Sequence, residues 1–184
     1  LIRQEKLIMS ITQAPLVLVT GVSGFIASWV AHGALKLGYR VRGTVRSLEN
    51  EAKVQHLRDL YPGSAYKIEL VEADLLSETG WDAAVAGCDY ILHVASPFYT
   101  TVSDPEELIR PAVDGTLNVL KAASRLSTPP KRVVVTSSVA AMYQGQDSAG
   151  KTFNDLSWTV PDDKAYPVGP YPMSKYLAEK AAWE

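Results

Sequence analysis

The 184-residue sequence contains a single cysteine, Cys88, so no disulfide can form within the chain. Cys88 stands just before an apolar run, which favours a buried, reduced thiol and a cytoplasmic setting. No apolar run reaches the roughly 18 residues that a membrane-spanning helix needs. The formal net charge is only −2, which gives no reason to expect binding to nucleic acid or to a membrane surface. No group of His, Cys, Asp and Glu residues has the spacing of a metal site.

The rest of the composition is that of an ordinary globular domain, with 47% hydrophobic and 21% charged residues. The opening stretch LIRQEKLIMS is too short and too interrupted by charge to be a secretory signal, and Met9 is a candidate for the natural start. We therefore expect residues 1–12 to be an N-terminal extension and residues 13–184 to form one domain.

Short β-branched runs alternate along the chain with stretches of helical periodicity. The runs predict strands at 15–20, 40–46, 65–74, 90–96 and 132–138. The periodic stretches predict helices at 24–38, 48–61, 78–87 and 104–126, and a last helix from near Tyr171, after a long loop over 144–170. This alternation predicts an α/β fold of the Rossmann type, a doubly wound parallel sheet with helices on both faces. Ligands bind such sheets beyond the carboxyl ends of the strands.

Three residues predict how individual helices begin, end or bend. Gly38 is expected to end the first long helix, and Asp104 to cap the start of the helix over 104–126. Pro111, inside that same helix, is expected either to kink it or to start it afresh.

A glycine pair follows the first strand in VTGVSGFIA. Gly21 permits a tight turn and a close backbone approach, and the third position of the motif, Ala27, is small enough for the helix to lie close to the strand. Free N–H groups at the helix start are then placed to bind a pyrophosphate. The predicted contacts of a dinucleotide here are Gly21, Ser23, Gly24, Phe25 and Ile26.

The end of the second strand distinguishes between cofactors. An acidic residue there would bind the ribose of NAD, but the chain has RGTVRS instead. A guanidinium at Arg46 suits the 2′-phosphate of NADP, with Lys53 as a second candidate. Arg42 is the weaker candidate, because four strand residues place it roughly 13 Å back from Arg46.

Two further strand ends carry candidate contacts. Asp74 and Leu75 follow the third strand, where an aspartate can accept a hydrogen bond from an adenine amino group. The fourth strand leads into small residues that leave room for a cofactor, Val94, Ala95 and Ser96.

The three histidines are isolated from one another. His93 lies inside an apolar run and is predicted to be a packed core residue. His32 and His56 fall on helices and are expected to be surface or packing residues.

Serine, tyrosine and lysine near the end of the chain suggest a proton-transfer site. Ser138 follows the fifth strand, where it can hydrogen-bond a carbonyl group, whereas strand alternation points its neighbour Ser137 elsewhere. Spacing alone does not prove which serine faces the ligand. Tyr-x-x-x-Lys then occurs twice, as Tyr171/Lys175 and as Tyr176/Lys180.

Both pairs place an ammonium beside a phenol on one helix face, which favours the phenolate and makes the tyrosine a usable acid. Helical phase separates the two pairs. Tyr171 and Lys175 share a stripe with Ala178 that can pack on the protein body, while the second pair lies roughly 140° away. We therefore predict Tyr171/Lys175 to be the functional pair.

These motifs together resemble those of a known family. TGVSGFIA, ADL, TSS and YPMSK, in this order, resemble the extended short-chain dehydrogenase/reductase superfamily. RGTVRS, HVASP and YPMSKYLAEKAAWE are similar to the branch that holds dihydroflavonol 4-reductase, cinnamoyl-CoA reductase and the fungal NADPH-dependent aldehyde/ketone reductases. The resemblance runs from about residue 15 to the end of the chain.

The resemblance implies an oxidoreductase that takes hydride from NADPH and reduces a small-molecule carbonyl compound. It implies that Ser138 holds the carbonyl oxygen, that Tyr171 protonates it, and that Lys175 binds the nicotinamide ribose and tunes Tyr171. It also implies that Arg46 and Lys53 contact the 2′-phosphate.

The chain departs from the family pattern in three places. Ala112 replaces an asparagine of many members, so a proton relay through that side chain is not expected. Tyr143 replaces the asparagine that holds the flavonoid in plant dihydroflavonol reductases, so dihydroflavonol is not the expected substrate. Family members continue beyond Glu184 into a substrate-binding part. We therefore expect a truncated chain that lacks most of the pocket and exposes apolar surface, with a tendency to form a homodimer.

Two alternatives to a carbonyl reductase follow from the same motifs. One is an NAD-dependent nucleotide-sugar epimerase or dehydratase of the same superfamily, against which Arg46 speaks. The other is a truncated, non-catalytic NADP-binding module. We expect the entrance for a substrate to be lined by residues 96–101, Tyr143 and the loop 144–170.

Overall fold

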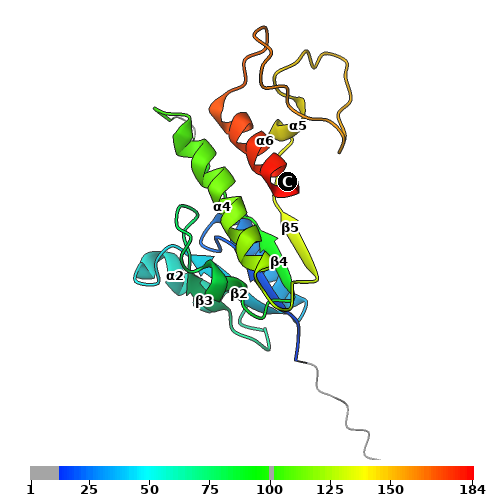
Figure 1. The fold of residues 1–184 in the computed structure, drawn as a ribbon. Coiled ribbons are helices and arrows are strands. Elements are labelled where there is room, and N and C mark those ends of the chain that lie inside the picture. Colours follow the sequence, from blue (N-terminus) through cyan, green and yellow to red (C-terminus); the bar gives the residue numbers. More distant parts are fainter. Residues whose placement is uncertain (1–12, 100–101) are drawn as a thin grey trace, which may run out of the picture.

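The protein forms a five-stranded parallel sheet in the order β3-β2-β1-β4-β5 (Figure 1). The structure is a computed structural model and describes residues 13–99 and 102–184, so the extension expected at 1–12 lies outside the described residues. The strands are β1 (Leu16–Val19), β2 (Arg40–Val45), β3 (Glu69–Glu72), β4 (Tyr90–His93) and β5 (Arg132–Val135). The chain order reverses between β1 and β4, as in a doubly wound sheet, which confirms the predicted fold class.

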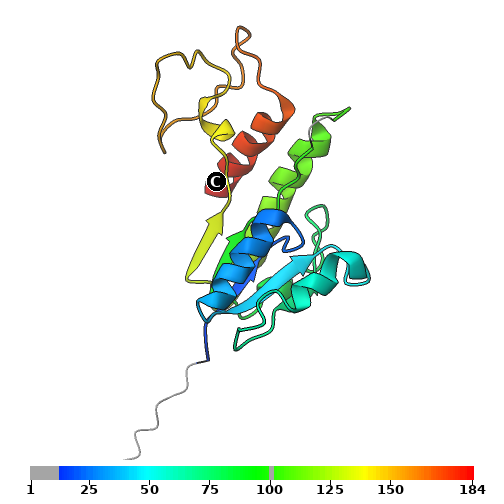
Figure 2. The same ribbon diagram turned by 180° about the vertical axis from the view of Figure 1, so that it is seen from behind.

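Helices cover both faces of the sheet, as Figures 1 and 2 show from opposite sides. One face is covered by α1 (Phe25–Lys36) and α2 (Glu51–Arg58), and the other by α3 (Trp81–Val85) and α4 (Glu106–Ser124). The short α5 (Ala140–Tyr143) and the last helix, α6 (Pro170–Trp183), pack against each other, and α6 also lies along α4.

Alternation along β1 divides the core into two halves. Leu16 and Leu18 face α3 and α4, where they pack around the buried ring of Trp81. Val17 and Val19 face α1 and α2 on the opposite side. All four β1 side chains are buried, which explains why this strand reads as a continuous apolar run rather than an alternating one.

The predicted elements exist, and the differences concern their bounds. β3 is shorter than the predicted 65–74, and α5 forms directly after the fifth strand, where no separate helix was predicted. Within 144–169 the described chain contains no helix or strand, so the long loop is confirmed. Pro111 does not start a new helix, because α4 continues through it.

The predicted helix ends are confirmed. Gly38 follows α1 with a positive φ of 85°, and its N–H donates to the Leu35 carbonyl oxygen at 3.0 Å. Asp104 precedes α4, and its carboxylate accepts the Glu106 N–H at 3.0 Å. This bond satisfies one of the free donors at the helix start.

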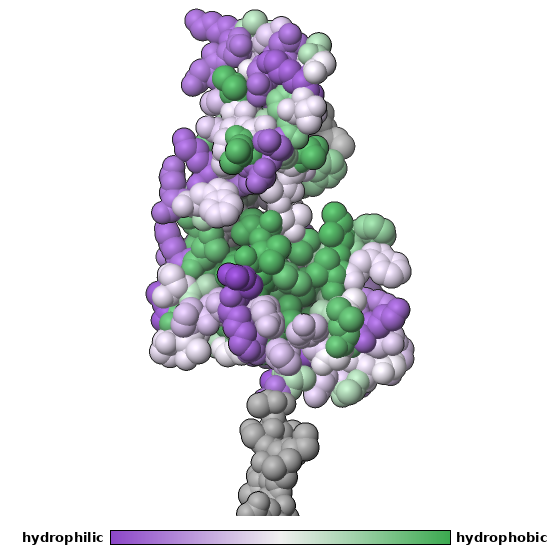
Figure 3. Space-filling model, turned by 90° about the vertical axis from the view of Figure 1, so that its right-hand side faces the viewer, coloured by the Kyte–Doolittle hydropathy of each residue, from purple (hydrophilic) through white to green (hydrophobic). Residues whose placement is uncertain are grey.

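The edge of the sheet at β5 carries a hydrophobic surface. Figure 3 shows hydrophobic side chains gathered on the side of the molecule where β5 lies in Figure 1. Val134 of β5 is 55% exposed there, although it belongs to a strand of a parallel sheet. Among the described residues, no helix is long and apolar enough to cross a membrane.

Arg42 stabilises the packing of α3 against the sheet. Its Nη1 donates to the carbonyl oxygens of Ala83, Ala84 and Ala86 at 2.7 to 3.2 Å, at the end of α3. Its Nε pairs with Glu69 of β3 at 3.0 Å, and its side chain is only 12% exposed. A cation at a helix C-terminus also interacts favourably with the helix dipole. Arg42 is therefore a structural residue, in keeping with its lower rank as a cofactor ligand.

We predict that Arg42→Ala lowers the free energy of unfolding by about 2–4 kcal/mol, because three carbonyl oxygens lose a charged donor. Urea unfolding followed by circular dichroism measures this loss. The matched control is Arg132→Ala, an exposed arginine of β5, which should change stability by less than about 0.5 kcal/mol. Equal losses in the two variants would contradict the structural role of Arg42.

Candidate active site

The turn after β1 brings the chain against the end of β4. Gly21 has a φ of 70°, and a Cβ built on it would lie 3.0 Å from the Cβ of Ala95. Its N–H donates to Thr44 Oγ1 at 2.8 Å, and the next N–H, of Val22, donates to the Thr44 carbonyl oxygen at 3.0 Å. The turn therefore touches β2 on one side and β4 on the other. Only glycine combines this φ with this close approach.

The start of α1 is open to a ligand. Gly24 is its N-cap with extended backbone, and Ala27 is buried where the helix approaches the sheet. Ser23, Phe25 and Ile26 are exposed, and within the described chain their N–H groups have no backbone acceptor. Three free donors at a helix start favour an anion.

Arg46 directly follows β2 on the same edge. Arg46 and Lys53 are both exposed, and neither forms an ion pair with another described residue. The backbone of Ala73 bonds the Val45 carbonyl oxygen at 3.0 Å, which sets the end of β3 beside the end of β2. Asp74 therefore lies on the same edge as Arg46.

Asp74 and Leu75 also have structural contacts. The Asp74 Oδ1 accepts the Leu76 N–H at 2.9 Å, which forms a tight local turn. Leu75 packs against Gly115 of α4, where an added Cβ would meet its side chain at 2.6 Å. One carboxylate oxygen of Asp74 has no partner among the described residues and is available to a ligand.

Thr20 fixes the loop after β4. Its Oγ1 accepts the N–H groups of Val94 and Ala95 at 3.0 and 2.9 Å, which holds this backbone next to Gly21. The same oxygen bonds His93 Nδ1 at 3.0 Å. His93 is 3% exposed, so the prediction of a packed histidine is confirmed. Burial, and then the charge of Lys175, lower the pKa of His93 to about 4.

The two serines after β5 have different partners. The Ser137 hydroxyl donates to the Glu179 carboxylate of α6. The Ser138 oxygen accepts the Ala140 N–H at 3.2 Å, at the start of α5. The two side chains therefore have different surroundings, and Ser137, not Ser138, lines the cavity that Lys175 also lines.

The Tyr171/Lys175 pair lies on the inner face of α6. Lys175 is only 7% exposed, and burial lowers the pKa of its ammonium. Its Nζ lies 5.8 Å from the centre of the Tyr171 ring. The edge of that ring meets Phe98 of the loop after β4, with centroids 5.1 Å apart. The pair thus stands between α6 and the loop that follows Ala95 and Ser96.

The second pair has the same internal geometry in a different place. Lys180 Nζ lies 5.9 Å from the centre of the Tyr176 ring, but Lys180 is exposed. Tyr176 packs edge-on against Trp158 of the long loop at 6.0 Å. The two pairs differ in burial and in neighbours rather than in spacing.

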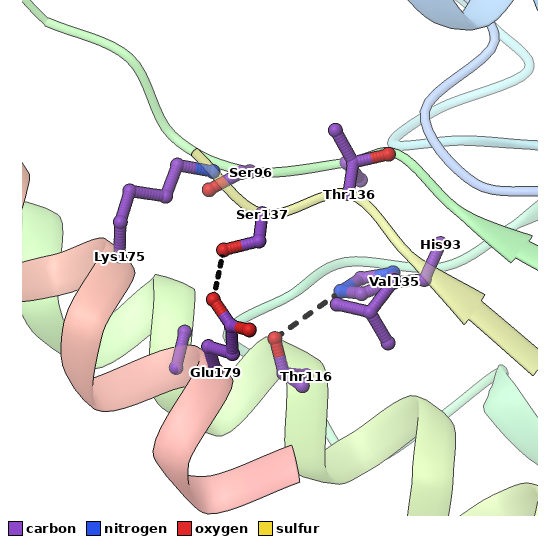
Figure 4. A pocket seen from close by; sticks show the side chains of 10 residues that line it. His93, Ser96, Thr116, Val135, Thr136, Ser137, Lys175 and Glu179 are labelled. Carbon is purple, nitrogen blue, oxygen red and sulfur yellow. Dashed lines mark hydrogen bonds between the residues drawn. The ribbon is translucent and has the colours of Figure 1, made fainter. Parts of the chain in front are cut away.

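Figure 4 shows a small cavity lined by Lys175 and Ser96, and the Lys175 side chain extends toward Ser96. The cavity holds about 10 Å³, enough for one water molecule. Ser137 and Glu179 form one bonded pair in its wall, and His93 and Thr116 form another. A second, open hollow of about 410 Å³ is lined by Tyr143, Tyr166 and neighbouring loop residues. Thr100 and Thr101, expected at the substrate entrance, lie outside the described residues.

Sequence reasoning missed three residues of this site, namely Thr20, Thr44 and Glu179. Thr20 and Thr44 stand at or near the ends of predicted strands, so their positions were a usable signal. Phe98 falls within the stretch 96–101 expected at the substrate entrance, but its contact with Tyr171, like that of Glu179 with Ser137, joins distant segments and has no local signal in the sequence.

Comparison with known proteins places these observations in a family. The model of the NAD dependent epimerase/dehydratase family matches residues 17–184. A putative anthocyanidin reductase of Ginkgo biloba is 45% identical over 175 residues, covering 92% of this chain and 51% of that protein. The cinnamoyl-CoA reductase CAD2 of Medicago truncatula is 46% identical over 171 residues, covering 91% and 52%.

A solved structure has the same fold. Yeast methylglyoxal/isovaleraldehyde reductase Gre2, solved in complex with NADPH, superposes with a TM-score of 0.75 at 33% identity, covering 91% of this chain and 52% of that one. The chain therefore spans about half the length of the relatives that it matches. With the glycine turn, the β1/β4 reversal and a family match over nearly its whole length, this chain belongs to the NAD dependent epimerase/dehydratase family.

Proposed function

We propose that residues 13–184 form the cofactor-binding and catalytic domain of an NADPH-dependent reductase that transfers hydride to an aldehyde or ketone carbonyl. One observation carries the proposal. Lys175 is only 7% exposed beside Tyr171, it lines a small cavity, and burial lowers the pKa of its ammonium. A lysine whose pKa is shifted by burial and which lines a cavity is a candidate functional residue.

The residues at the strand ends fit a dinucleotide phosphate. Gly21 leaves a space that any Cβ would fill, and the free N–H groups at the start of α1 suit a pyrophosphate. Arg46 and Lys53 are unpaired cations at the end of β2, which suits an additional 2′-phosphate. NADPH, when bound, supplies the hydride. The NADPH complex of the yeast relative supports this choice.

Three side chains would handle the carbonyl oxygen and its proton. Ser138 donates a hydrogen bond that orients the carbonyl group and polarises it. Tyr171 donates its phenolic proton to the oxygen as negative charge develops there. The ammonium of Lys175 stabilises the phenolate that remains. A small-molecule carbonyl compound is the expected substrate, and the hollow beside Tyr143 is a candidate part of its entrance.

The two alternatives remain as outcomes of the tests. An NAD-dependent nucleotide-sugar epimerase or dehydratase would favour an acid at the end of β2, where Arg46 stands. A non-catalytic NADP-binding module would bind NADPH without reducing any carbonyl compound.

We predict that Arg46→Ala weakens NADPH binding about 10- to 100-fold and leaves NADH binding nearly unchanged, because only NADPH carries the 2′-phosphate. Fluorescence titration of this chain with each nucleotide measures both dissociation constants. Arg132→Ala is the control and should change neither constant. A wild-type chain that prefers NADH would favour the epimerase or dehydratase instead.

We predict that Tyr171→Phe lowers the rate of carbonyl reduction at least about 100-fold, because the general acid is lost. Tyr176→Phe is the matched control, since its lysine neighbour lies at the same distance, and it should keep most of the activity. NADPH oxidation is followed with a panel of aldehydes and ketones, on this chain and on a version continued past Glu184. Reduction that survives Tyr171→Phe would contradict the assignment, and NADPH binding without any reduction would favour the binding module.

A further inference from the structure

His93 connects three elements through one buried imidazole. It ends β4, and its two ring nitrogens bond to side chains from β1's end and from α4. Nδ1 lies 3.0 Å from Thr20 Oγ1, and Nε2 lies 3.4 Å from Thr116 Oγ1, the bond drawn in Figure 4. His93, Thr20 and Thr116 are each no more than 3% exposed, so these bonds are shielded from bulk water.

The other bonds of the two threonines fix the direction of the chain of hydrogen bonds. Thr20 Oγ1 already accepts two N–H groups, from Val94 and Ala95, so its own proton is the one that goes to His93 Nδ1. Nδ1 is then an acceptor, and the imidazole proton lies on Nε2, where it is donated to Thr116. The Thr116 hydroxyl in turn donates to the Ala112 carbonyl oxygen at 2.8 Å.

This chain of bonds ends at the cofactor site. The two N–H groups that Thr20 accepts belong to Val94 and Ala95. A Cβ built on Gly21 would lie 3.0 Å from the Cβ of this same Ala95. If Thr20 turned away from His93, its lone pairs would no longer be directed at this backbone. One hydroxyl, that of Thr20, therefore bonds both His93 and the backbone that lies beside the glycine turn.

We propose that His93 is a positioning residue of the cofactor site, which holds the Thr20 hydroxyl, and through it the Val94–Ala95 backbone, as the neutral tautomer with its proton on Nε2. The proposal rests on the proposed binding of NADPH for its functional consequence. The tautomer itself is a property of the free chain.

The charges around His93 agree with a neutral ring. From α6, Lys175 and Glu179 line the same cavity; α4 presents Thr116, and the end of β5 and the residue after it present Val135 and Thr136. Burial and the positive charge of Lys175 both oppose protonation of the imidazole. Glu179 accepts the Ser137 hydroxyl rather than a proton of His93.

The tautomer is tested by ¹⁵N NMR of the imidazole in the free wild-type chain at pH 7. We expect an unprotonated Nδ1 and a protonated Nε2. A ring with its proton on Nδ1, or an imidazolium, would overturn the proposal whatever the chain does with NADPH.

The positioning role is tested with two replacements of His93. His93→Asn keeps an amide oxygen near Nδ1 that can accept the Thr20 proton, whereas His93→Leu keeps only bulk. We expect NADPH to bind His93→Leu about fivefold to tenfold more weakly than the wild type, and His93→Asn to recover most of that loss. The thermal unfolding midpoint is measured beside each dissociation constant, and the amide ¹⁵N–¹H signals of Val94 and Ala95 should shift more in His93→Leu. Equal NADPH affinity in the two variants would overturn the proposal.

Two replacements of Thr116, the partner of His93 Nε2, form a second matched pair of variants. Thr116→Ser keeps the acceptor for Nε2–H and should leave the tautomer, the unfolding midpoint and NADPH affinity unchanged, while Thr116→Val should lower the unfolding midpoint and keep the tautomer, because Thr20 still donates to Nδ1. A Thr116→Val chain with its imidazole proton on Nδ1 would contradict the network. A wild type that does not bind NADPH would refute the proposed function, while the NMR results would still decide the role of His93.

We further predict a loss of stability with acid that depends on His93. The folded pKa of about 4 lies below the ordinary value of 6.5, so the unfolded chain binds the extra proton between these values. Stability from this group is therefore complete above pH 6.5 and falls as the pH drops toward 4. The urea midpoint of the wild type should fall more between pH 7 and pH 4.5 than that of His93→Asn. Parallel falls in both proteins would contradict the prediction.

Discussion

The close approach of Gly21 to the end of β4 is the constraint on which the site depends. A positive φ at Gly21 turns the chain sharply, and the 3.0 Å that a Cβ would leave to Ala95 shows how tightly the two segments meet. Thr44 holds this turn from the side of β2 and Thr20 holds the opposing loop, each through hydrogen bonds to backbone N–H groups. At the switch point of the sheet, the glycine turn and the loop after β4 are thereby held close together.

Burial gives the two Tyr-x-x-x-Lys pairs different chemistry. Their lysine-to-ring distances are nearly equal, at 5.8 and 5.9 Å, so the geometry within the helix does not distinguish the two pairs. Only Lys175 is turned into the protein, where loss of hydration lowers the pKa of its ammonium. Lys180 stays in water, where its charge is screened and its neighbour Tyr176 packs on a loop tryptophan. An identical motif thus has a different chemical character on each face of one helix.

Arg42 in β2 and Arg46 just after it also have different roles, although only four residues separate them. Arg42 points to the face of the sheet covered by α3, where carbonyl oxygens accept its hydrogen bonds and Glu69 balances its charge. Arg46 has left the strand, is exposed, and has no ion pair within the described chain. A structural cation and a candidate phosphate ligand can therefore be told apart by their partners, although both belong to one basic segment.

The sequence by itself determined the succession of strands and helices along the chain, the glycine turn, the cation after β2 and the inward-facing Lys175 on α6. These features follow from local rules, because periodicity, turn chemistry and helical phase act over a few residues. It also predicted a buried His93 and helix ends at Gly38 and Asp104.

Only the tertiary structure decided which side chains meet across the sheet. Thr20 with His93, Thr116 with His93, Phe98 with Tyr171 and Ser137 with Glu179 are separated by 23 to 73 residues. Their meeting depends on the strand order and on how α4 and α6 pack together, which no local pattern encodes. The bounds of β3 and the presence of α5 were decided in the same way, since short elements owe their stability to packing rather than to propensity.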